Sequence, residues 1–208
     1  MNELPSINQF LSDVPDSYLG LAVKHGRVSI DTETSGLDWK NNTISVIQLQ
    51  VSDAPTAIVR VGNTLPANVL SIISNGNIEK IFHHALFDLR FICWTWDVSP
   101  KNIACTKIAS KLLYPNEPLK QHLTYLLSDA LNIFIDKSLS VSNWTDSELS
   151  VAQLDYARND VIHLETLYEV LLIRLRERHL EGLARACFDH VPTRVVLDLN
   201  EYPDVYDY

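Results

Sequence analysis

Three runs rich in β-branched residues stand in the first third of the chain, and they restrict its fold more than any other feature. They are RVSIDTE (27–33), TISVIQLQVSD (43–53) and TAIVRVG (56–62), with turn-forming residues between them. Strands joined by such short turns pair with their neighbours in sequence, so the runs predict an antiparallel meander. Only one or two short strand patterns follow, EKIFHHA (79–85) among them. The predicted fold is therefore α/β, a mixed sheet that contains this meander and is flanked by helices.

The remaining patterns are mainly helical. They are PANVLSIISN, LFDLRFICWTW, TKIASKLLY and LKQHLTYLLSDAL, followed by a longer one that begins near Ser150. Ser150 and Gln153 fit an S-x-x-Q capping box. Apolar residues spaced by three and four then extend from Leu154 to Leu175, which predicts one helix of about six turns. Because no repeat or linker interrupts it, and 46% of its residues are hydrophobic, the chain suits a single domain over 1–208.

Charge and cysteine content narrow the classes of function. The net charge of −9 disfavours a broad basic surface for long nucleic acids, because that mode of binding requires many phosphate contacts. Cys93, Cys105 and Cys187 form no C-x-x-C pair, which is typical of buried thiols in a reducing compartment. The sequence shows no signal-peptide pattern and no apolar run of membrane-spanning length. We therefore expect a cytoplasmic protein without membrane contact.

Two acids interrupt the first strand pattern. Asp31 and Glu33 are two residues apart, and the alternation of a strand places them on one face together with Ser29. Two carboxylates that are close together repel, and each raises the pKa of the other. A divalent cation between them removes this penalty, whereas a solvated strand end avoids it. The D-x-E pattern alone does not decide between these two interpretations.

Two further segments carry candidate site residues. In IFHHALFD, Asp88 follows an apolar strand and falls in the first turns of a helix, where an acid also stabilises the helix N-terminus. The adjacent His83 and His84 fit substrate contact or hydrogen-bonded packing. In YARND, Tyr156 and Asp160 are neighbours on one helix face beside the apolar seam. Residues placed in this way can face a cleft, or they can belong to the ordinary flank of a helix.

Taken together, Asp31, Glu33, Asp88 and Asp160 are four acids beside rigid elements. Carboxylate oxygens without a cysteine or histidine cluster suit Mg²⁺ or Mn²⁺ rather than zinc. Two such ions about 4 Å apart clamp the attacking and leaving oxygens of a phosphodiester. Tyr156, one turn before Asp160, supplies a hydroxyl that can orient the attacking water. The four acids and Tyr156 therefore predict a catalytic site with two divalent metal ions.

The order and context of DTE, the Asp88 segment and Y-x-x-x-D resemble the DEDDy exonucleases, which have a ribonuclease H-like fold. Residues 119–168 are similar to ribonuclease D, and they include its D-K…S-x-W segment at Asp136, Lys137, Ser142 and Trp144. The segments CTKIASKLLY and ARACFDHVPTRVVLDL are similar to nano-RNase C, a compact bacterial member. The resemblance implies 3′→5′ hydrolysis to nucleoside 5′-monophosphates, with the four acids as metal ligands.

The same resemblance implies how substrate is bound. Leu37 matches a leucine that wedges between two bases, His83 matches a histidine that contacts substrate, and Thr32 is assigned to substrate binding with them. His84 departs from the aromatic residue or asparagine expected there, which leaves its role open. The implied substrate is short single-stranded RNA, dinucleotides especially.

The implied assembly is a homo-oligomer, a ring-like octamer, and the segment 190–208 is expected to be an arm that packs on the chain or on a neighbouring subunit. The alternatives are a general RNA or DNA 3′→5′ exonuclease and an inactive nucleic-acid-binding module. An inactive module would be expected to lose at least one metal carboxylate, and all four acids are present.

Overall fold

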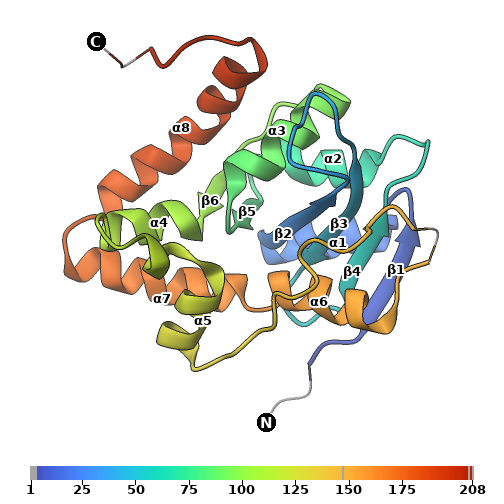
Figure 1. Ribbon diagram of the computed structural model, residues 1–208, viewed down its shortest axis with the longest axis horizontal. Helices are drawn as coiled ribbons and strands as arrows, with labels where there is room; N and C mark the ends of the chain where they lie inside the picture. The colour runs from blue at the N-terminus through green and yellow to red at the C-terminus, as the bar shows by residue number, and fades with distance from the viewer. Residues whose placement is uncertain (1–3, 147, 206, 208) are drawn as a thin grey trace.

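A mixed six-stranded sheet lies at the centre of the protein (Figure 1). It is seen in a computed structural model that describes residues 4–146, 148–205 and 207. The spatial order of the strands is β1-β4-β3-β2-β5-β6. Their bounds are Ile7–Leu11 (β1), Arg27–Thr34 (β2), Ile44–Gln50 (β3), Thr56–Arg60 (β4), Glu79–Phe82 (β5) and Ile103–Cys105 (β6).

The predicted meander is confirmed, because β2, β3 and β4 pair in antiparallel order. Strands β5 and β6 extend the sheet in parallel from β2, which makes it mixed. Strand β1 was not predicted from the sequence. It pairs in parallel with β4 at the edge of the sheet, and its burial is too slight to require a continuous apolar pattern. Its sequence, INQFL, does not alternate regularly between apolar and polar residues, so periodicity does not detect this edge strand.

Helices cover both faces of the sheet (Figure 1). They are α1 (Asp16–His25), α2 (Ala67–Ser74), α3 (Ala85–Trp96), α4 (Thr106–Leu113), α5 (Leu123–Leu131), α6 (Val151–Val161), α7 (Leu164–Glu177) and α8 (Glu181–Leu199). On one face, Tyr18 of α1 is buried in the main core and donates a hydrogen bond to the backbone oxygen of Leu49. On the other face, Ala157 of α6 packs with Val46 and Ile58. Helix α6 thereby covers β2, β3 and β4.

The single long helix predicted after Ser150 is wrong, because the chain turns at Ile162 and His163 and forms α6 and α7. The predicted capping box is confirmed, since Ser150 and Gln153 each accept a hydrogen bond from the other's backbone amide. The apolar seam is continuous in sequence, but its two halves pack against different elements. Helix α6 packs on the meander, whereas α7 packs on α4, α5 and the strands β2 and β5. A straight helix cannot lie along both, so packing breaks it.

The segment 190–208, predicted to be a packing arm, begins within a helix. Residues up to Leu199 belong to α8, which packs on α3 and β6 and buries Val191 and Val195. The non-helical tail begins after this helix, and Glu201 pairs with Lys40 of the loop after β2. Tyr206 and Tyr208 lie outside the described residues. Within the part of the chain that the structure describes, no helix is both long and apolar enough to cross a membrane.

Candidate active site

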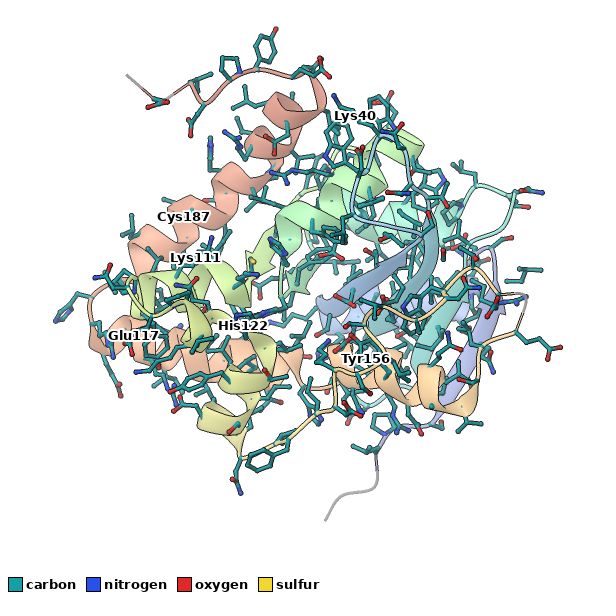
Figure 2. All side chains as sticks on the ribbon, in the orientation of Figure 1. Lys40, Lys111, Glu117, His122, Tyr156 and Cys187 are labelled. Carbon is teal, nitrogen blue, oxygen red and sulfur yellow. The ribbon has the colours of Figure 1, made fainter. Side chains whose placement is uncertain are left out.

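A cavity of about 460 Å³ opens where the end of β2, the start of α3 and helix α6 meet. Irregular chain between α5 and α6, residues 132–150, forms another part of its wall. Tyr156 of α6 lies below β2 in Figure 2. The predicted site residues that line the cavity are Asp31, Thr32, Glu33, Leu37, Asp88, Tyr156 and Asp160. Folding thus brings together residues that are up to 129 positions apart (160 − 31).

Three of the four predicted metal ligands converge. One carboxylate oxygen from each of Asp31, Glu33 and Asp160 lies within 4.8 Å of the other two. Strand alternation places Asp31 and Glu33 on the face that α6 covers, and α6 adds Asp160. Asp88 lines the same cavity but lies outside this trio, and its carboxylate accepts a hydrogen bond of 2.7 Å from the Thr32 hydroxyl. The trio is the part of the site that the geometry joins most closely.

The electrostatics of the cavity suit a divalent cation. Burial, followed by repulsion from Asp88, Asp160 and Glu33, raises the pKa of Asp31 well above its ordinary value. Burial and the charge of Asp160 raise the pKa of Glu33 to about 8, and burial raises the pKa of Asp88 to about 7. Clustered carboxylates with such pKa values carry uncompensated repulsion when ionised, and a cation relieves it. Because the trio offers only oxygen donors, these residues fit Mg²⁺ or Mn²⁺.

Lys137 is a site residue to which the sequence assigned no role. Its ammonium group forms an ion pair with Asp160, lies 3.1 Å from the Tyr156 hydroxyl, and lies 4.6 Å from the centre of the Tyr156 ring. The one sequence feature that pointed to Lys137 was the D-K…S-x-W segment shared with ribonuclease D. Trp144 of the same segment packs on Tyr156, with ring centres 5.6 Å apart.

Tyr156 is held as a protonated phenol. Burial, together with the negative charges of Asp160, Glu33 and Asp31, raises its pKa far above the ordinary value. The hydroxyl therefore keeps its proton at neutral pH and can act as a hydrogen-bond donor beside the carboxylates. The structure agrees with the predicted neighbourhood of Tyr156 and Asp160 on one helix face, since both line the cavity.

The two adjacent histidines lie in different surroundings. His83 does not line the cavity; its Nδ1 lies 2.9 Å from the Thr106 hydroxyl, and burial lowers its pKa to about 3. His84 does line the cavity, and its ring stacks on Phe87 with centres 6.1 Å apart. Both histidines follow the last residue of β5, Phe82, and His84 is the N-cap residue of α3. Substrate contact by His83 stays a prediction.

Leu37 lies at the rim of the cavity, and its side chain is 84% exposed. An apolar side chain so exposed beside a polar cavity is available for contact with a base. Thr32 lines the cavity as well, but its hydroxyl is already used in the bond to Asp88. Thr32 therefore orients an acid in this structure, and its assignment to substrate binding remains a prediction.

Comparison with known proteins identifies the class to which this fold and site belong. The model of the 3′–5′ exonuclease family matches residues 11–176. Ribonuclease D from Haemophilus influenzae is 28% identical over 73% of this chain and 37% of its own length, and ribonuclease D from Zymomonas mobilis is 30% identical over 73% and 39%. The protein therefore belongs to the 3′–5′ exonuclease family and is related to ribonuclease D. It spans less than half the length of these curated relatives.

One solved relative is similar over nearly the whole chain. NrnC from Brucella melitensis is 32% identical, with a TM-score of 0.89 over 98% of both chains. Structures of that protein with bound Mg²⁺ and bound to pGG are similar to this chain as well. Escherichia coli RNase D, at 19% identity and a TM-score of 0.79 over 90% of this chain and 50% of its own, shares the fold. The ribonuclease H-like fold and the kinship to nano-RNase C predicted from the sequence are confirmed.

Proposed function

We propose that this protein is a metal-dependent 3′→5′ exoribonuclease that hydrolyses short oligoribonucleotides, dinucleotides included, to nucleoside 5′-monophosphates. The observation that carries the proposal is the convergence of three carboxylate oxygens within 4.8 Å, in a cavity that Tyr156 and Leu37 also line. The structures of Brucella melitensis NrnC with Mg²⁺ and with pGG support it.

The residues of the cavity divide into three roles in this proposal. Asp31, Glu33 and Asp160, with Asp88 beside them, would hold two Mg²⁺ or Mn²⁺ ions. When bound, such ions stabilise the charge on the phosphate and lower the pKa of water. The protonated Tyr156 hydroxyl orients the attacking water by hydrogen bonding. Leu37 stacks between the last two bases at the rim of the cavity.

Charge and size favour a short substrate. The net charge of −9 repels the backbone of a long RNA, whereas a dinucleotide carries few phosphates. The cavity of about 460 Å³ is in the range that encloses small ligands. We further propose a homo-oligomer, the octamer that the resemblance implies, in the cytoplasm, where free thiols such as those of Cys93 and Cys105 persist.

The decisive experiment is a substrate-length series. A 5′-labelled diribonucleotide, a longer RNA and a single-stranded DNA are each incubated with Mg²⁺ and with chelator. The proposal expects the diribonucleotide to be degraded fastest and every rate to vanish in chelator. Equal rates on the long RNA and the diribonucleotide would overturn the preference for short substrates. Full activity in chelator would overturn the metal-dependent mechanism.

A general RNA or DNA exonuclease is the second candidate. Its support is the 37% identity to DNA polymerase I from Aquifex aeolicus, which covers 95 residues and 46% of this chain. Faster degradation of DNA than of RNA at matched length would favour this candidate. An inactive binding module is disfavoured, because all four acids and Tyr156 are present and line one cavity.

A further inference from the structure

Five buried polar atoms of side chains have no hydrogen-bond partner among the described residues. They are Ser29 Oγ, Gln48 Oε1, Gln48 Nε2, Trp144 Nε1 and Arg158 Nε. Their residues belong to β2, β3, the chain between α5 and α6, and α6 itself. All of these elements except β3, which pairs with β2, contribute residues to the wall of the cavity. Native proteins leave few such atoms unpaired, because each unpaired group loses its hydration without compensation. Their concentration behind one site therefore points to a role in that site.

Gln48 stands out because both ends of its amide are unpaired and its side chain is fully buried. It is the direct cross-strand partner of Asp31 in the antiparallel pair of β2 and β3. Directly paired residues project to the same face of the sheet, with Cβ atoms about 4.5–5.5 Å apart. On that face Val46 and Ile58 are apolar and belong to the cluster beneath α6, whereas Gln50, two residues along β3, is polar. Among the polar residues on this face, Asp31 is the one directly opposite Gln48.

Gln50 lies two residues further along β3 and on the same face, but its amide is satisfied. It donates to the backbone oxygens of Val51 and Ala54, and it accepts a hydrogen bond from the Thr56 hydroxyl. Buried glutamine on this strand can therefore be fully bonded. The unpaired state of Gln48 is particular to the position opposite Asp31.

We propose that Gln48 is a positioning residue for the metal site, whose Nε2 donates a hydrogen bond to the Asp31 carboxylate when that carboxylate binds a divalent cation. The inference rests on the proposed metal-dependent function. A hydrogen bond from a second residue fixes the orientation of a metal-binding carboxylate, and its loss commonly lowers metal affinity 10–100-fold. A buried amide without a partner has lost its hydration without compensation, so an apolar side chain in its place is not expected to lower stability.

The test compares Gln48→Met with the matched control Gln50→Met. Mn²⁺ binding is measured by calorimetry, and melting temperature is measured in chelator. We expect Gln48→Met to bind Mn²⁺ roughly 10-fold or more weakly, with a melting temperature no lower than that of the wild type. Gln50→Met is expected to melt lower and to bind Mn²⁺ like the wild type. In activity assays, Gln48→Met should need more metal for half-maximal rate and recover most of the rate at saturating metal.

Equal Mn²⁺ affinity in Gln48→Met and the wild type would overturn the inference and leave the proposed function standing. Absence of Mn²⁺ binding to the wild type would overturn the proposed metal site itself. A crystal structure of the Mn²⁺-loaded wild type provides a measurement that does not depend on the folding of a variant. It should show Gln48 Nε2 at hydrogen-bond distance, about 2.7–3.2 Å, from an Asp31 oxygen. A separation too long for a hydrogen bond would contradict the assignment.

Discussion

The four acids of the cavity differ in their contacts, although each carries the same charge when ionised. Asp31, Glu33 and Asp160 meet through their oxygens, whereas Asp88 stands beside them and is oriented by Thr32. Lys137 offsets part of the negative charge at Asp160, and its ion pair lowers the pKa of that carboxyl against the raising effect of burial. Nearly isosteric substitutions, such as aspartate to asparagine, can therefore test the role of a charge at this site without changing the packing.

Asp88→Asn should abolish turnover and leave the fold intact. The amide oxygen of asparagine can still accept the hydrogen bond from Thr32, so the packing of α3 is kept while one metal-binding charge is lost. We expect a loss of activity of about 100-fold or more, measured as single-turnover hydrolysis of a diribonucleotide. Circular dichroism and melting temperature report the fold. An unchanged rate would refute the assignment of Asp88 to the metal site.

Tyr156→Phe should slow hydrolysis by about 100-fold or more while metal binding is preserved, because the hydroxyl that orients water is removed and the carboxylates remain. Rates and Mn²⁺ affinity are measured on the same preparation. Tyr168→Phe is the matched control, since Tyr168 is also a buried tyrosine bonded to an acid, Glu79, but lies outside the cavity lining. A similar slowing in both variants would mean that the loss is structural.

Helix α6 both packs on the sheet and carries residues of the cavity, and it is hydrogen-bonded to the segment that precedes it. One side of α6 packs on the meander through Ala157, and the same helix carries Tyr156 and Asp160 into the cavity. Gln153 caps its first turn and also donates a hydrogen bond of 3.0 Å to the backbone oxygen of Asn143. One side chain thus holds both the helix and the segment that carries Lys137 and Trp144.

Gln153→Ala should affect stability and substrate binding together. Loss of the reciprocal cap is expected to lower the free energy of unfolding by about 1 kcal/mol, which denaturant titration measures. The segment 132–150 would also lose an anchor, so KM for a diribonucleotide should rise. Ser150→Ala removes the other half of the cap without the bond to Asn143, and it should lower stability with a smaller change in KM. An identical KM in both variants would contradict the anchoring role.

The protein as a whole is acidic, and part of that charge is concentrated in one buried cavity. The folded-state pKa of Glu33 is about 8 and that of Asp88 is about 7, both above the values of about 4 expected in an unfolded chain. The folded protein therefore holds these protons more tightly than the unfolded chain does. This contribution to stability is complete below the unfolded pKa and is lost as pH rises through the folded values.

In chelator, the melting temperature should consequently fall between about pH 5 and about pH 8. Added Mn²⁺ should raise it more at the upper end of this range, because metal binding requires deprotonated carboxylates. Differential scanning fluorimetry across pH measures both effects. Glu33→Gln removes one of the responsible groups and should flatten the pH dependence in chelator. The same slope in this variant and the wild type would show that other groups cause it.

Local sequence patterns were enough to predict the meander, most of the helices, the capping box, and the four acids and Tyr156, which line one cavity. These features depend on local periodicity, on pairs a few residues apart, or on motifs whose order along the chain is preserved. The common face of Asp31 and Glu33 follows from strand alternation alone.

Long-range packing fixed the break between α6 and α7, the addition of β1 and the extension of α8. It also decided that His84 rather than His83 borders the cavity, that Lys137 reaches Tyr156, and that Asp88 stands apart from the trio. The pairing of Gln48 with Asp31 belongs to the same group, since it depends on the register between two strands. Local patterns predict the face of a helix or strand on which a side chain lies. The distance between side chains of different elements depends on how those elements pack, and they are far apart in sequence.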